Sequence, residues 1–92
     1  MAMSDNDIVI CNKAINKYTP ARQIVQAMEE LGELQQALAR HLNCRNNNVE
    51  EEIADVEIML TQLKIIFDLK KIENFRKHKL QRLEGRINSH EC

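Results

Sequence analysis

Helix-breaking residues are almost absent from this chain, which has one proline and two glycines among its 92 residues. None of these three lies between Glu50 and Glu84. Because only three side chains are aromatic, the core must be built mainly from Leu, Ile, Val, Met and Ala. This composition favours helices over a β-sandwich or a β-barrel. We therefore expect an all-α fold.

The first half of the sequence predicts two helices. Asp5 and Asp7 are candidate caps for a short helix that reaches Tyr18. Thr19 is then expected to cap a second helix that begins at Pro20, because a proline at the first helical position loses no hydrogen bond. The second helix runs to about residue 42. Its expected apolar face comprises Ile24, Met28, Leu31, Leu38 and Leu42, and is widened by Ala27, Leu34 and Ala37.

The second half predicts two more helices after a polar, asparagine-rich loop at 43–48. Asn48 and Glu51 have the spacing of a capping box at the start of the third helix. Asp68 is expected to cap the last helix. The apolar stripe of the third helix comprises Ile53, Val56, Leu60, Leu63 and Phe67, and that of the last helix comprises Ile72, Phe75, Leu80, Leu83 and Ile87.

We expect residues 1–92 to form one domain, a helical hairpin with flanking helices. A chain this small buries only a modest share of its surface. We therefore expect a four-helix-bundle-type core that is completed by homo-oligomerisation, as a homodimer or a homotetramer. No apolar run has the length of a membrane span, and the first residues do not resemble a signal peptide. These features predict a cytoplasmic protein with no membrane partner.

Charge is distributed unevenly along the sequence. The formal net charge is only −1, and basic residues are not interleaved with aromatic ones, so no nucleic-acid partner is expected. The segment 29–58 has a local balance of −6, whereas the segment 64–86 has a balance of +5. An acidic middle is therefore followed by a basic tail.

Four acidic residues stand out because they interrupt the two most apolar helices. Glu30 and Glu33 are three residues apart, as are Glu52 and Asp55, so each pair shares one helix face. The two pairs are nearly equidistant from the loop at 43–48, and an antiparallel hairpin would bring them to the same level. Carboxylates gathered in this way repel one another unless a cation is bound.

Oxygen ligands without histidine or cysteine favour Mg²⁺, with Mn²⁺ as the alternative. Magnesium retains water and binds phosphate oxygens, so such a site implies a phosphorylated substrate. The alternative for either pair alone is the solvated face of an amphipathic helix.

The segments Glu29–Leu34 and Glu52–Val56 resemble the E-x-x-E and E-x-x-D signature of the MazG-like all-α nucleoside triphosphate pyrophosphohydrolases, over roughly residues 20–70. This resemblance implies Mg²⁺-dependent hydrolysis of a nucleoside or deoxynucleoside triphosphate to the monophosphate and pyrophosphate. It implies metal binding by Glu30, Glu33, Glu52 and Asp55. It also implies a catalytic role for Glu30, which would orient or deprotonate the attacking water.

Lys79 and Arg82 lie on one face of the last predicted helix. If the resemblance holds, they are the candidate substrate-binding residues, because a departing pyrophosphate requires cationic donors. The alternative for these two is a solvated charged face. The alternative for the whole chain is a non-catalytic helical oligomerisation or interaction module.

Overall fold

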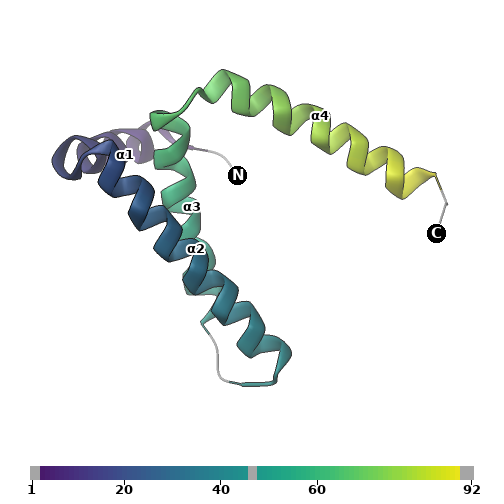
Figure 1. Ribbon diagram of the computed structural model, residues 1–92. Coiled ribbons are helices and arrows are strands. Elements are labelled where there is room, and N and C mark those ends of the chain that lie inside the picture. Colours follow the sequence, from purple (N-terminus) through teal and green to yellow (C-terminus); the bar gives the residue numbers. More distant parts are fainter. Residues whose placement is uncertain (1–2, 46–47, 90–92) are drawn as a thin grey trace.

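The computed structural model describes residues 3–45 and 48–89 (Figure 1). All regular structure in these residues is helical, which confirms the predicted all-α class. The elements are α1 (Asp5–Tyr18), α2 (Pro20–Leu42), α3 (Val49–Ile66) and α4 (Leu69–Asn88). The predicted loop at 43–48 includes residues 46 and 47, which lie outside the described residues.

The beginnings of α1 and α2 are fixed by local hydrogen bonds. The cap of α1 is Ser4, not Asp5 or Asp7 as predicted. The Ser4 hydroxyl accepts from the backbone N–H of Asp7 at 3.0 Å, and the Asp7 carboxylate accepts from the backbone N–H of Ser4. Asp7 therefore completes a capping box from its third position. Thr19 caps α2 as predicted, and its hydroxyl accepts from the N–H of Arg22 at 3.3 Å.

The beginnings of α3 and α4 differ in how far they follow the prediction. Asp68 caps α4 by accepting from the N–H of Lys71 at 3.0 Å, as expected. The predicted capping box of Asn48 and Glu51 is wrong, because the Asn48 side chain makes no capping hydrogen bond. Its amide instead donates to the carboxylate of Glu52 at 2.7 Å. Asn48 therefore orients the Glu52 side chain instead of capping α3.

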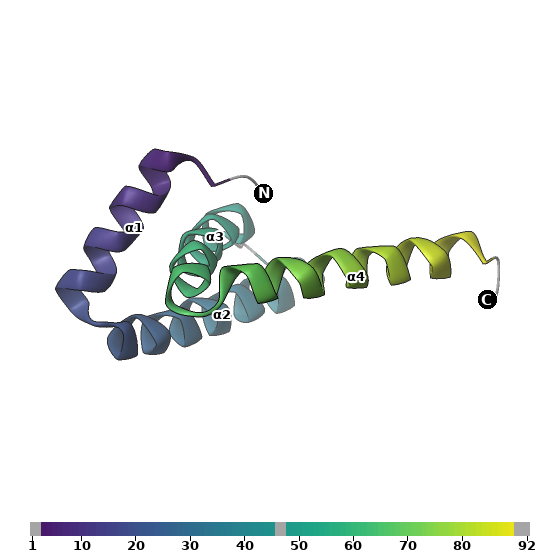
Figure 2. The same ribbon diagram turned by 90° about the horizontal axis from the view of Figure 1, so that it is seen from above.

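Helices α2 and α3 form an antiparallel hairpin, which is the main packing unit of the chain (Figure 1). Helix α1 packs against both of them, and the Cys11 thiol lies 3.9 Å from the carbonyl oxygen of Ile58. Helix α4 extends from the end of α3 on the side of the hairpin away from α1 (Figures 1 and 2). Within the described residues, α4 packs against no element other than α3.

The hairpin packs through the alanine edge of the apolar face that was predicted for α2. Gln23, Ala27 and Ala37 are its buried residues, whereas the predicted apolar stripe stays largely exposed. Met28 is 66% exposed and Leu42 is 81% exposed. The buried positions of α2 carry alanine and glutamine, and the bulkier apolar side chains are left largely exposed. Within one chain, Ala27 and Ala37 of the predicted face are buried as expected, whereas the expectation that the larger residues Met28, Leu31, Leu38 and Leu42 are buried is wrong.

A single chain leaves its core incomplete. Its Cα radius of gyration is 16.0 Å, whereas a compact domain of this length has about 12 Å. None of the described helices is long and apolar enough to cross a membrane. Most of the large apolar side chains are exposed: Val9, Ile10, Tyr18, Val25, Met28, Leu31, Leu38, Leu42, Ile53, Ile58, Phe67, Leu69, Phe75, Leu80, Leu83 and Ile87.

Candidate metal centre

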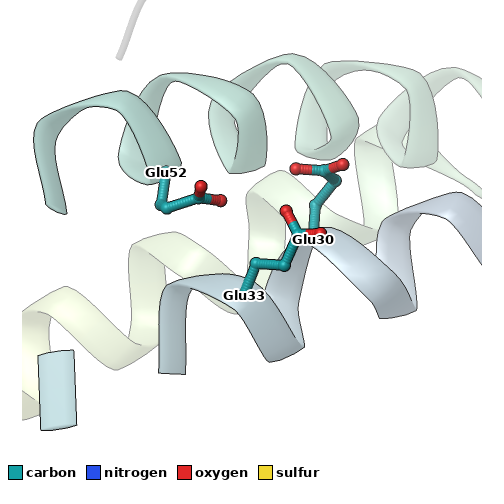
Figure 3. A group of neighbouring side chains, drawn as sticks. All are labelled: Glu30, Glu33 and Glu52. Atoms are coloured by element: carbon teal, nitrogen blue, oxygen red, sulfur yellow. The ribbon is translucent and has the colours of Figure 1, made fainter. Parts of the chain in front are cut away.

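The α2–α3 hairpin brings three glutamates together near its loop end (Figure 3). Glu30 and Glu33 lie one turn apart on α2, and Glu52 lies opposite them on α3. Each contributes one carboxylate oxygen to a group in which all oxygens lie within 4.8 Å of one another. Asp55, the fourth predicted ligand, lies one turn further along α3, is half-buried and is not part of this group.

Glu52 is the buried member of the cluster, with only 7% of its surface exposed. Its Oε1 accepts a hydrogen bond of 2.7 Å from the Asn48 amide. Its Oε2 is buried and has no hydrogen-bond partner among the described residues. A buried charged oxygen without a partner costs more than the roughly 1–3 kcal/mol of an unsatisfied neutral group, so a proton or a cation bound at this atom would stabilise the site.

Glu30 repeats the same arrangement on α2. Its Oε1 accepts a hydrogen bond of 3.0 Å from the amide of Gln26, one turn earlier on the same helix. Its Oε2 is also buried without a hydrogen-bond partner in the part of the chain that is described. In both glutamates a neutral amide orients one oxygen and leaves the other for the shared site, as outer-shell partners do for metal ligands.

Mutual repulsion dominates the electrostatics of the cluster. The charge of Glu30 raises the pKa of the Glu33 carboxyl above its usual range, and the charge of Glu52 raises it further. Desolvation and hydrogen bonds from a protonated Glu33 to Glu52 and Glu30 act in the same direction. Because Glu33 itself is exposed, a proton or a small cation from solvent can reach the cluster and relieve this repulsion.

The donor set fits a hard divalent cation. The three carboxylate oxygens offer no nitrogen or sulfur ligand, which suits Mg²⁺ or Mn²⁺ better than Zn²⁺. The independent observation is that Glu30 and Glu52 each have a buried oxygen with no hydrogen-bond partner among the described residues. A cluster of three glutamates that can hold a metal ion is therefore present.

A buried pair of amides, which sequence reasoning missed, connects the helices that carry the cluster. The Gln23 amide donates to the Gln62 side-chain oxygen at 2.7 Å, and both residues are buried. Gln62 also lies 3.8 Å from the sulfur of Met59. A shift of α3 along α2 would leave both amides unsatisfied in the core. The pair therefore fixes the register of the two helices, which places Glu30 opposite Glu52. Glutamine on an otherwise apolar helix face was the available signal.

Lys79 and Arg82, the predicted substrate-binding residues, lie on exposed turns of α4. This helix leads away from the hairpin (Figure 1), so one chain does not bring them to the glutamate cluster. Their role in binding phosphate stays a prediction. No protein-family model, curated protein or solved structure matches the chain.

Proposed function

We propose that this protein is a Mg²⁺-dependent nucleoside or deoxynucleoside triphosphate pyrophosphohydrolase. The observation that carries the proposal is the convergence of Glu30, Glu33 and Glu52, two of which have a buried carboxylate oxygen without a hydrogen-bond partner among the described residues. The E-x-x-E and E-x-x-D pattern of the sequence supports the same chemistry. Mn²⁺ is the alternative ion.

In the proposed reaction a water oxygen forms a bond to the α-phosphorus, and the bond from that phosphorus to the oxygen bridging to the β-phosphate breaks. The electron pair of the broken bond leaves with pyrophosphate. Glu30 accepts the proton of the water, with Gln26 holding its other oxygen. Glu30, Glu33 and Glu52 would hold Mg²⁺, with Asp55, one turn further along α3, as the proposed fourth ligand. The ion would supply charge neutralisation at the phosphates and activation of the water.

The remaining parts of the proposal concern the substrate and the assembly. Lys79 and Arg82 would bind the pyrophosphate portion, because their charges match the oxygens that gain charge as it departs. The active protein would be a homodimer or a homotetramer, in which a second copy covers apolar surface that one chain exposes. An exposed stripe on α2 supports this assembly.

The decisive experiment measures pyrophosphate release across the common nucleoside and deoxynucleoside triphosphates with Mg²⁺, with Mn²⁺ and with a chelator. We expect metal-dependent turnover of at least one nucleotide, and its loss in Glu52→Gln and Asp55→Ala. Glu51→Gln is the matched control, because it makes the same charge change one residue away on an exposed position. Full turnover in both site variants would discard the proposal.

The second candidate is a non-catalytic helical oligomerisation module, which is favoured by the exposed apolar surface. It differs from the enzyme in its response to metal. A preformed metal site raises the melting temperature in Mg²⁺ by linkage, whereas solvated acids give little change. Equal melting temperatures with Mg²⁺ and with chelator, together with no turnover, would select the module.

A further inference from the structure

Helix α4 presents an apolar face that its own chain does not cover. No residue of α4 is buried, and Ile72 is the only one that is even half-buried among those described. Ile72, Leu80, Leu83 and Ile87 share one side of the helix by their spacing. Most helix stability in proteins comes from packing of such an apolar face. The α4 face therefore needs a partner surface.

A second uncovered apolar face lies on the hairpin. Met28, Leu31, Leu38 and Leu42 follow one side of α2 at helical spacing, and Ile53 of α3 is also exposed. By helical spacing in an antiparallel pair, Ile53 of α3 lies on the same side of the hairpin as the apolar stripe of α2. Helix α4 leaves the hairpin opposite α1, so an open angle separates α4 from the hairpin (Figures 1 and 2).

The area of uncovered surface is large enough for a stable interface between two copies. The chain exposes 7478 Å², whereas a compact monomer of 10.7 kDa exposes about 5500 Å². The excess of roughly 2000 Å² exceeds the approximately 800 Å² that each partner buries in a standard interface. A second copy that fills the open angle would remove an area of this size.

Charge indicates which surfaces pair. Helix α4 contains seven basic and two acidic residues, a net charge of +5, whereas α2 and α3 together carry −5. Pairing α4 with another α4 would bring two strongly positive helices together. Placing α4 on the hairpin of another copy brings together elements of opposite net charge, which favours this arrangement over self-pairing.

We propose that α4 is an exchanged arm: the apolar face of α4 in each copy docks on the Met28–Leu31–Leu38 face of the hairpin in a second copy. The exchange is reciprocal, as a two-fold interface requires. It would also bring the basic side chains of α4 to the acidic hairpin of the partner. The inference rests on the proposed function only in that copies of the chain associate, and it uses nothing of the chemistry.

The test is complementation between two double variants of the full chain. One carries Leu80→Gln and Leu83→Gln on α4, and the other carries Leu31→Gln and Leu38→Gln on the hairpin. Glutamine keeps helix propensity and adds no charge. Val9→Gln with Val25→Gln is the matched control, because these residues are similarly exposed and lie outside both faces. Circular dichroism checks that each variant is helical.

Association is measured by sedimentation equilibrium and by native mass spectrometry, with one variant labelled with ¹⁵N. We expect the wild type and the control to associate, and each double variant to dissociate at least roughly thirty-fold more readily. An equimolar mixture of the two double variants regains association as mixed dimers, because one of the two reciprocal contacts is then intact. Self-pairing of α4 or of the hairpin gives no such recovery.

Two results would overturn the inference. One is a monomeric wild type, and the other is a mixture of the double variants that associates no better than either variant alone. Both measurements are made without nucleotide or Mg²⁺, so they do not depend on turnover. An assembly that complements but releases no pyrophosphate would refute only the proposed function.

Discussion

Neutralising Glu52 should stabilise the metal-free protein while removing its response to metal. Glu52→Gln keeps the size of the side chain and an oxygen that can accept from Asn48, but it removes one of the converging charges. Most buried substitutions destabilise a protein. An increase in stability from changing a residue that is only 7% exposed would therefore be specific to repulsion in the cluster.

The size of this stabilisation follows from the separation between the half-buried carboxylate of Glu30 and the buried carboxylate of Glu52. The carboxylate oxygens of the group lie within 4.8 Å of one another, and two unit charges at that limit repel by about 3 kcal/mol at an effective dielectric of about 20, and by about 1 kcal/mol at the dielectric of water. We expect Glu52→Gln to raise the free energy of unfolding by about 1–3 kcal/mol in chelator. For a domain of this size, each kcal/mol corresponds to about 4–8 °C in the melting temperature.

The assay is thermal unfolding by circular dichroism at fixed protein concentration, in chelator and in Mg²⁺. The wild type should gain about 2.7 kcal/mol when Mg²⁺ is present at a hundred times its dissociation constant, and Glu52→Gln should gain much less. Glu51→Gln, the control, should keep the metal response and lose a few tenths of a kcal/mol at the helix N-terminus. A lower stability of Glu52→Gln in chelator, or an undiminished metal response, would refute the reasoning.

Three further predictions concern protonation, register and capping. Folding raises the pKa of Glu33, so its contribution to metal-free stability is present at low pH and is lost as pH rises through that pKa. Mg²⁺ titrations should show the affinity for Mg²⁺ falling as pH is lowered through the same range, because protonation of Glu33 competes with the ion. A pH-independent affinity would contradict this. Gln62→Ala should lower the urea-derived stability by about 1–3 kcal/mol, since it leaves the buried Gln23 amide unsatisfied; a neutral effect would show that the pair does not fix the register. Asp68→Ala should cost about 1 kcal/mol in the same measurement, and no loss would mean that the α4 cap does not contribute.

Periodicity and capping residues predicted the four helices and the turn between α1 and α2. They did so because helix formation depends on interactions within a few residues, such as those of Thr19 and Asp68 with the N–H groups that follow them. The three-residue spacing of Glu30 and Glu33, and the mirrored position of Glu52, likewise predicted that the hairpin would bring these acids together. Those are consequences of helix geometry alone.

Only the tertiary structure decided which face of each helix is covered. The sequence offers α2 one wide apolar face, and local rules prefer its bulky residues for the core. Packing against α3 instead buries Gln23, Ala27 and Ala37 at the edge of that face. The roles of Asn48 and Gln26 beside the carboxylates also depend on that packing, because a side-chain amide chooses among acceptors according to what the fold places within reach. Local sequence determines the helices, whereas burial and the pairing of polar groups are settled only when distant segments compete for the same neighbours.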